Sequence, residues 1–220
     1  MDKFETMGDF FDRVSELYDA HMGKNIEAFE RFYSAIGAGI TETQDEVRIL
    51  DIGCGTGLEL AAVFERAPNA LITGIDLSGE MLDILRDKYT AYRNQITLVQ
   101  ESYLTYSFDE KTCDYIISVM TVHHLLPESK CELYRKIRKA LKFGGKYIEG
   151  DYITTPEKEK EVRDSFYEIQ KSNRGLEDGT HHIDLECSLE TQKRLLAEAG
   201  FTTVEVLWEQ GEAAVYSASI

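Results

Sequence analysis

The chain has 220 residues, of which 43% are hydrophobic and 29% are charged, and this balance is typical of one soluble globular domain. Its 24 basic and 40 acidic residues give a net charge of −16, and such a surface repels the phosphate backbones on which nucleic-acid affinity depends. No apolar run approaches the roughly 18 residues of a membrane-spanning helix. We therefore expect neither a nucleic-acid nor a membrane partner.

The N-terminal stretch and the cysteines both favour a cytoplasmic location. Residues 1–19 are acidic and amphipathic, and they lack the basic start and apolar middle of a secretion signal. Cys54, Cys113, Cys131 and Cys187 form no C-x-x-C pair, which argues against a zinc site and against a disulfide framework. Cys54 lies in a Gly-rich loop, and we interpret it as a small packing residue.

Strand and helix patterns alternate along almost the whole chain. In chain order they predict helices over 9–18 and 26–36, a strand over 47–52, a helix over 57–67, a strand over 70–75, a helix over 79–89 capped by Ser78, and strands over 96–99 and 113–120. They then predict a helix over 127–141 that stops at Phe143-Gly144-Gly145, a strand over 146–152, helices over 156–172 and 189–199, the latter capped by Gly200, and a hairpin of strands 202–208 and 213–219 around Gly211. Residues 173–187 show no clear period. The alternation predicts a doubly wound α/β fold with a mostly parallel sheet.

The helix predicted over 127–141 contains the basic stretch 130–142. We interpret its lysines and arginines, Lys130 included, as a solvated face, with Leu133, Ile137 and Leu141 on the buried side.

A Gly-rich loop, Asp51-Ile52-Gly53-Cys54-Gly55-Thr56-Gly57, follows the first predicted strand and opens a helix. An open parallel sheet binds ligands there, beyond the carboxyl ends of its strands. Asp76 ends the next strand about 20 residues further on, where a carboxylate can accept hydrogen bonds from ribose hydroxyls. Glu101 follows the third strand, so we expect these acids to line one cleft with the loop.

The loop spacing is G-x-G-x-G rather than the G-x-G-x-x-G of dinucleotide sites. Asp51 before the loop and Glu59 after it disfavour a pyrophosphate and favour a cationic ligand. S-adenosylmethionine, which has no phosphate and which has sulfonium and ammonium groups, suits this charge better than NAD.

Five blocks of this sequence stand out in chain order: VRILDIGCGTG, GIDLSGEML, LVQESYLTY, FDEKTCDYIISVMTVHHL and LKFGGKYIEGDY. In their order and spacing they resemble the class I (Rossmann-like) S-adenosylmethionine-dependent methyltransferase family. They cover 47–152, and the later helix-strand-strand pattern extends the match. The resemblance implies a seven-stranded sheet with the last strand antiparallel. It also implies a set of cofactor-binding residues: Tyr18, Asp51, Gly53, Gly55, Asp76, Leu77, Met81, Glu101, Ser102 and Met120. On this basis we divide a single methyltransferase domain into an N-terminal helical lid (1–45), a cofactor-binding core (46–153), an insert (154–187) and a closing helix and hairpin (188–220).

The catalytic candidates are His123, His124 and Asp151, because they follow the fourth and fifth predicted strands, near the expected position of the transferable methyl group. Tyr152 and two histidines of the insert, His181 and His182, are candidates for acceptor binding. Their spacing matches no metal-binding motif, so we expect no metal.

We expect in-line methyl transfer to a small-molecule acceptor. Three alternatives remain open: an NAD-dependent oxidoreductase, a non-catalytic S-adenosylmethionine-binding regulator, and methylation of a protein. A homodimer is also left open.

Overall fold

The computed structural model describes residues 4–26, 28–172 and 175–220; the parts of the predictions that fall on 1–3, 27, 173 and 174 lie outside the described residues. The strands are β1 (Arg48–Ile52), β2 (Leu71–Asp76), β3 (Ile96–Gln100), β4 (Cys113–Val119), β5 (Leu141–Tyr152), β6 (Thr203–Gln210) and β7 (Ala213–Ser219). The α-helices are α1 (Met7–Asn25), α2 (Phe29–Ala38), α3 (Leu60–Arg66), α4 (Gly79–Lys88), α5 (Pro127–Ala140), α6 (Pro156–Ser172) and α7 (Leu189–Glu198). Two short 3-10 helices are η1 (Thr90–Tyr92) and η2 (Val122–His124).

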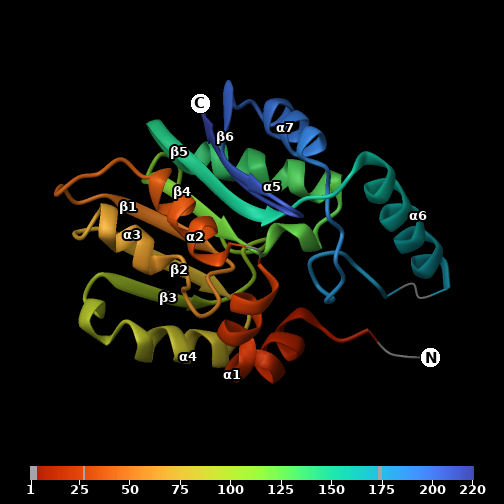
Figure 1. Ribbon diagram of the computed structural model, residues 1–220, viewed down its shortest axis with the longest axis horizontal. Coiled ribbons are helices and arrows are strands. Elements are labelled where there is room, and N and C mark those ends of the chain that lie inside the picture. The colour runs from red at the N-terminus through yellow and green to blue at the C-terminus, as the bar shows by residue number, and fades with distance from the viewer. Residues whose placement is uncertain (1–3, 27, 173–174) are drawn as a thin grey trace.

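The strands form one seven-stranded sheet in the order β3-β2-β1-β4-β5-β7-β6, with helices on both faces (Figure 1). β7 is antiparallel to both of its neighbours, β5 and β6, and the other neighbouring pairs are parallel. The predicted fold is therefore confirmed, including the antiparallel last strand and the helix, α6, inserted after β5.

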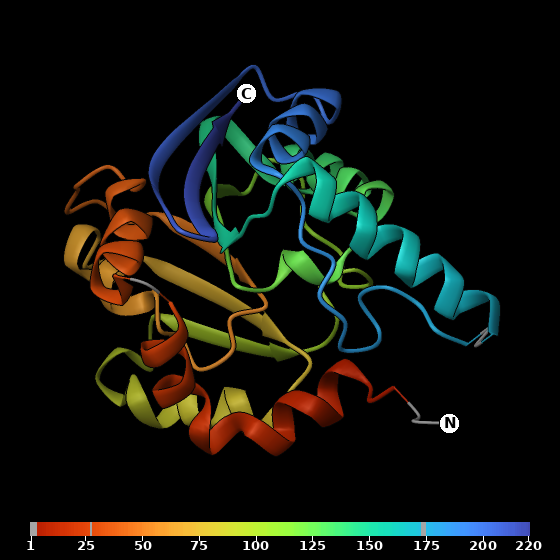
Figure 2. The ribbon, with the colours of Figure 1, turned by 45° about the vertical axis from the view of Figure 1, so that its right-hand side comes forward.

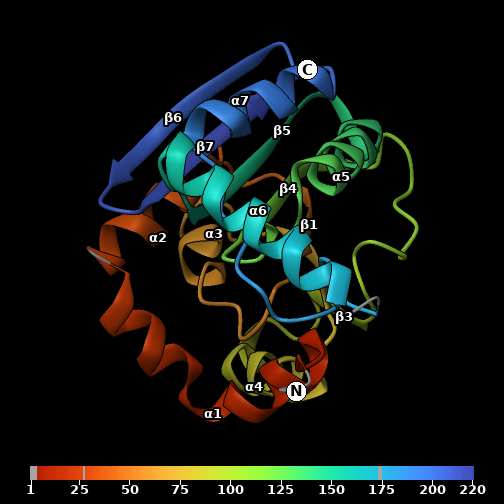
Figure 3. The same ribbon diagram turned by 90° about the vertical axis from the view of Figure 1, so that its right-hand side faces the viewer.

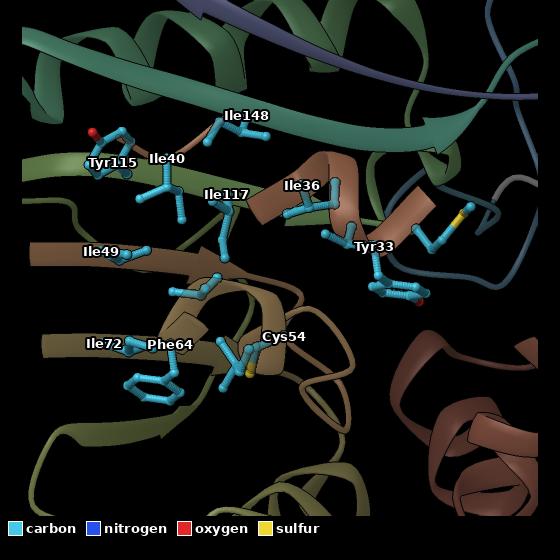
Figure 4. Close-up of a cluster of buried hydrophobic side chains, with 14 of the residues drawn as sticks. Tyr33, Ile36, Ile40, Ile49, Cys54, Phe64, Ile72, Tyr115, Ile117 and Ile148 are labelled. Atoms are coloured by element: carbon cyan, nitrogen blue, oxygen red, sulfur yellow. The ribbon is translucent and has the colours of Figure 1, made fainter. Parts of the chain in front are cut away.

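Successive residues of the central strands pack into two different cores, one on each face of the sheet. Ile49, Ile117 and Ile148 pack with Ile36 and Ile40 from the region of α2 (Figure 4). Their sequence neighbours on the strands belong to the core beneath α5 and α7, and they are Leu50, Ile116 and Tyr147. Because both faces are covered, both alternating positions are apolar, which explains the uninterrupted apolar runs of the sequence.

Several predicted boundaries were wrong. α1 begins after the cap Thr6 and ends only at Asn25, well beyond the predicted limit of 18. The next helix starts at Phe29 and not at 26. The helix stop predicted at Phe143-Gly144-Gly145 lies inside β5, because Leu141 already pairs with Cys113 and an irregularity then absorbs the extra residues before the next pair, Tyr115 with Lys146.

The basic stretch on α5 was interpreted correctly except at its first residue. Leu133, Ile137 and Leu141 are buried as predicted, but Lys130 is fully buried, with 0% of its surface exposed. Its aliphatic stem adds to the apolar face of the helix, an orientation that the charge pattern does not reveal.

The N-terminal segment and the segment after α6 lie side by side at the carboxyl end of the parallel strands (Figure 2). The amide of Met7 donates to Thr180 O, and the amide of His182 donates to Glu5 O, at 2.9 and 3.1 Å. The amide of Leu185 donates to His123 O at 2.7 Å. α6 crosses the same end of the sheet (Figure 3), and its Phe166 packs with Leu185 and Phe4 of these two segments. In the described part of the chain, no helix is both long enough and apolar enough to span a membrane.

Candidate active site

The Gly-rich loop turns tightly over the ends of β2 and β4. The amides of Gly53 and Cys54 both donate to Ile75 O, at 2.8 and 3.1 Å. Gly53 has a φ of +67°, and a Cβ at this position would collide with the side chain of Thr121. At Gly55, by contrast, no heavy atom lies within 4 Å of the position that a Cβ would take. The loop thus leaves open space above Gly55 into which a ligand can fit.

Asp76 ties the loop to the start of α4. Its Oδ2 accepts a hydrogen bond from the amide of Gly55 and its Oδ1 accepts one from the amide of Ser78, each at 2.8 Å. Burial raises the pKa of Asp76 above its usual value, although these amide donors oppose the shift. The hydroxyl of Ser78 accepts from the amide of Met81, which confirms the predicted helix cap. Asp76 lines a small cavity together with Gly53 and Ser102.

Asp51 and Glu59 form a pair of fully buried carboxyl groups beside the loop. When both groups are ionised, both oxygens of Asp51 and Oε1 of Glu59 have no hydrogen-bond donor among the described residues, whereas a proton on one group forms a hydrogen bond to the other. Burial raises the pKa of Glu59 to about 7, and burial with the charge of Glu59 raises the pKa of Asp51 well above its usual range. Buried carboxyl groups with no partner except each other indicate a place for a positively charged ligand.

α1 is fastened over this loop by two of its aspartates. Ser78 Oγ donates to Asp12 Oδ1 at 2.6 Å. Thr56 Oγ1 donates to Asp19 Oδ1 at 2.5 Å, and Lys88 Nζ lies 2.6 Å from Asp19 Oδ2. The helix therefore covers the loop and the start of α4 together.

A cavity of about 420 Å³ lies between α1, the segment after β4, the end of β5 and the insert. Its wall is largely aromatic and imidazole, with Phe10, Phe11, Tyr18, His123, His124, Tyr152 and His182 among the lining residues. Phe11 and His124 also line the small cavity next to Asp76, and Tyr18 also lines a crevice beside the Gly-rich loop. The large cavity and the loop region thus share walls, and the cavity is of a size that suits a small organic molecule.

His123 and His124 lie side by side in this wall, with ring centroids 4.0 Å apart, and they have different electrostatic surroundings. His123 Nδ1 lies 2.5 Å from Asp151 Oδ1. Burial opposes the charged form of His123, but Asp151 and Asp184 outweigh it and raise its pKa. Burial and the neighbouring His123 lower the pKa of His124 well below its usual value. The surroundings therefore favour the charged form of His123 more than that of His124, whose neutral form is favoured.

Asp151 is held at three points. Besides the His123 ring, the backbone amides of His123 and Tyr152 donate to its two oxygens, at 2.9 and 2.8 Å. Burial alone would raise the pKa of Asp151, but His123 lowers it below its usual value. The carboxylate is thus ionised and fixed, and it sets the orientation of the His123 ring.

The structure brings most of the sequence-predicted site residues together. Those that line the cavities or the loop are Tyr18, Gly53, Gly55, Asp76, Leu77, Ser102, Met120, His123, His124, Tyr152 and His182. Met81 is buried beneath the α4 cap, and Glu101 is exposed, with Oε1 accepting from Thr105 Oγ1 at 3.1 Å. His181 lies in its own turn, with Nδ1 2.9 Å from Thr180 Oγ1, and it is not among the described residues that line the cavity.

Sequence reasoning missed Asp184 and the α1 residues Phe10 and Phe11 as part of one site. Phe10 stacks on His182 with a centroid distance of 3.4 Å, and Asp184 lies against both His123 and His124. The H-x-D spacing of His182 and Asp184 was a signal that could have identified the aspartate.

A doubly wound sheet, a Gly-rich loop after β1 and an acid at the end of β2 define an α/β protein that binds an adenosine cofactor. The sequence profile of the family described as "Methyltransferase domain" matches residues 49–145. The carboxy-S-adenosyl-L-methionine synthase of Campylobacter lari is 26% identical over 93% of this chain and 91% of its own length. The demethylmenaquinone methyltransferase of Symbiobacterium thermophilum is 30% identical over 67% of this chain and 59% of its own length.

Solved structures share the fold. The structure of DhpI with S-adenosylhomocysteine has a TM-score of 0.71 and 14% sequence identity to this chain. The match covers 96% of this chain and 93% of the DhpI chain. Phosphoethanolamine N-methyltransferase 2 of Haemonchus contortus has a TM-score of 0.58 at 22% identity, over 80% of this chain and 38% of its own. The chain belongs to the class I S-adenosylmethionine-dependent methyltransferase family, and its cofactor is S-adenosylmethionine.

Proposed function

We propose that this enzyme transfers a methyl group from S-adenosylmethionine to a small organic acceptor bound in the cavity between α1 and His123. The observation that supports this most directly is the shared wall: Phe11, Tyr18 and His124 line both the large cavity and the spaces next to the cofactor loop. An acceptor in the cavity would therefore lie next to a ligand on the loop.

The residues around the loop fit the cofactor by shape and by charge. Gly55 leaves open space, and Asp76 offers carboxylate oxygens towards a small cavity. Asp51 and Glu59 are buried acids with no partner except each other. When bound, the cofactor supplies an activated methyl group on a cationic sulfur. The chain's own contribution is to hold the acceptor in line with that methyl group and to exclude water.

We assign the activation of the acceptor to His123, His124 and Asp151. His123 and His124 line the cavity, His124 also lines the small cavity at Asp76, and Asp151 holds the His123 ring in a fixed orientation from behind. The fixed imidazole of His123 can orient a polar group of the acceptor, and the imidazole of His124, whose neutral form is favoured, can take its proton. Tyr152 and His182 are assigned to acceptor binding on their positions in the same wall.

A second candidate reaction follows from the relatives that are carboxy-S-adenosyl-L-methionine synthases, one of which matches over nine-tenths of both chains. The product that this name implies is a cofactor with an added carboxylate, which a cationic side chain nearby would stabilise. Arg13 lines the cavity, but its guanidinium lies 2.6 Å from Glu5, and the carboxylate of Asp184 lines the same space. This charge arrangement favours methyl transfer.

Two measurements test the proposal. S-adenosylmethionine and S-adenosylhomocysteine should raise the melting temperature, because they bind only the folded chain, whereas NAD and NADP should not. Cofactor with a labelled methyl group, incubated with metabolite pools, should yield a labelled small molecule. Mass spectrometry of the same mixture identifies a carboxylated cofactor if the second reaction occurs. Cofactor binding with neither product would favour the non-catalytic regulator, and label found only in protein would favour a protein acceptor.

The remaining expectations belong to this proposal. We assign 1–45 to a lid, 46–153 to cofactor binding, 154–187 to acceptor binding and 188–220 to closure of the sheet. A cytoplasmic location, the absence of nucleic-acid and membrane partners, and a homodimer stay predictions from the sequence.

A further inference from the structure

Three side chains in the wall of the acceptor cavity converge on one point. His123, His124 and Asp184 each offer a ligand atom, and these atoms lie within 4.8 Å of one another. Asp184 Oδ1 lies 3.7 Å from His123 Nε2, and it lies 3.4 Å from the nearer nitrogen of the His124 ring. Nitrogen and oxygen atoms bound to one ion at about 2.1 Å are spaced roughly 3 to 4 Å apart. The spacing therefore suits a single divalent cation.

The neighbours of these side chains support a cation at this point. Asp151 Oδ1 lies 2.5 Å from His123 Nδ1, which fixes the ring and leaves Nε2 on the side of Asp184. A carboxylate behind a histidine is the usual outer partner of a metal ligand. His124 Nδ1 donates a hydrogen bond to Ile183 O at 3.0 Å, which in the same way leaves Nε2 as the nitrogen of that ring that is free to bind an ion.

His124 gives an independent indication that a ligand is needed here. Its side chain is 3% exposed, and Nε2 has no hydrogen-bond partner among the described residues. A buried imidazole nitrogen without a partner is uncommon and indicates an unfilled position nearby. His124 borders both the acceptor cavity and the small cavity at Asp76. An ion at Nε2 would complete the surroundings of the ring, because Nδ1 already bonds to Ile183 O.

We propose that His123, His124 and Asp184 bind a divalent transition-metal ion of the Zn²⁺, Mn²⁺ or Fe²⁺ type, with its open positions on the acceptor cavity. Two imidazoles and one carboxylate form a donor set that such ions accept, whereas Mg²⁺ and Ca²⁺ favour oxygen ligands alone. The proposal departs from the expectation of no metal, because the His-His pair and the His-x-Asp segment come together only in the fold. Binding of the ion does not depend on the proposed reaction. The role that we give the ion, to hold and polarise an oxygen of the acceptor, does rest on the proposed function.

The test uses the full chain, stripped with a chelator and titrated with Co²⁺ in the absence of cofactor and acceptor. Calorimetry should give one ion per chain, and visible absorption should report imidazole and carboxylate coordination. Asp184→Asn should weaken binding at least about tenfold, because it removes a ligand and a negative charge. Asp184 has a 53% exposed side chain, so the variant should fold normally. Asp151→Asn should weaken binding about 10- to 100-fold by releasing the His123 ring.

The matched control is Glu186→Gln, which removes the same charge two residues along, outside the three-ligand group. It should bind Co²⁺ like the wild type. Binding of S-adenosylhomocysteine is measured for each variant in parallel, and we expect it to be unchanged in Asp184→Asn. The metal proposal is overturned if Co²⁺ fails to bind at one ion per chain, or if Asp184→Asn binds it as tightly as Glu186→Gln does. If the wild type does not bind S-adenosylhomocysteine at all, that result would instead count against the proposed reaction.

Discussion

Cofactor affinity should fall below about pH 7, because the buried acids Asp51 and Glu59 hold a proton that a cationic ligand has to displace. Burial raises the pKa of Glu59 to about 7, and Asp51 beside it is also shifted well upward. The ligand-free chain therefore keeps a proton on this pair at mildly acidic pH. A ligand with a sulfonium and an ammonium group favours the ionised pair, so binding releases that proton.

The size of the effect follows from that pKa. Each pH unit below it weakens binding by up to about tenfold, so the dissociation constant should rise about 16-fold, or about 1.6 kcal/mol, between pH 7 and pH 5.5. Staying below about pH 7.5 keeps the amino group of the ligand charged throughout. The folding stability of the ligand-free chain depends on pH in the opposite direction from the cofactor affinity. A carboxyl group whose folded pKa is raised stabilises at low pH, and the stability is lost as pH rises from about 4.5 to about 7, by about 3 kcal/mol for Glu59.

Isothermal calorimetry with S-adenosylmethionine and S-adenosylhomocysteine measures this affinity. Two buffers of different ionisation enthalpy count the protons released. Glu59→Gln cannot hold the proton, so its affinity should vary much less with pH. Glu65→Gln, at an exposed position of α3, the helix that follows Glu59, should behave like the wild type. A wild-type affinity that is flat between pH 5.5 and 7, or a Glu59→Gln variant that keeps the full slope, would refute the shared proton.

Three further predictions concern the cofactor loop and its cover. Asp76→Ala should raise the dissociation constant of S-adenosylhomocysteine about 30-fold or more, because it frees the amide of Gly55 and removes an acceptor for the ribose. The control Asp83→Ala, at an exposed position, should leave the affinity unchanged, and an unchanged affinity of Asp76→Ala would contradict its role. Gly53→Ala should destabilise the chain by at least about 1–3 kcal/mol in denaturant titrations, since its φ is positive and Thr121 fills the space, whereas Gly23→Ala in open space on α1 should not. The double variant Asp12→Ala and Asp19→Ala should speed proteolysis within α1 in the absence of cofactor, and a rate equal to that of Glu16→Ala would show that these contacts do not hold the helix.

The cofactor half of the site could be predicted because each of its features is local in sequence. Gly53 needs its positive φ within a short turn, Ser78 caps the helix that it precedes, and Asp76 ends the strand before it. The order of the strands then places these features together, since the carboxyl ends of neighbouring parallel strands share one edge. Of these features, Glu101 has only its position after the carboxyl end of a strand. It follows β3 as predicted, but its side chain bonds to Thr105 and stays exposed.

The long α1 and the buried Lys130 could not be predicted, because tertiary contacts decide both. The second half of α1 contains Gly23 and polar residues, and its pattern alone is weak. In the structure Asp19 bonds to Thr56 and Lys88, and these contacts hold the helix beyond residue 18. Lys130 is buried on a helix face that looks solvated in sequence because the insert covers it, and Cys187 of the insert lies close to it.

The acceptor half of the site depends on contacts between segments that are far apart in the chain. His182 reaches the cavity because backbone hydrogen bonds join its segment to residues 5–7 on one side and to His123 on the other. Such pairings have no periodic signal, which is why residues 173–187 look featureless in sequence.

The separation of the acceptor-binding segments from the cofactor-binding core has a functional consequence. Changes in the N-terminal residues or in the insert can reshape the acceptor cavity while Asp51, Gly53, Gly55 and Asp76, which belong to the core strands and their loops, keep their positions. Within one fold, acceptor choice is therefore free to vary on segments that the cofactor site does not require.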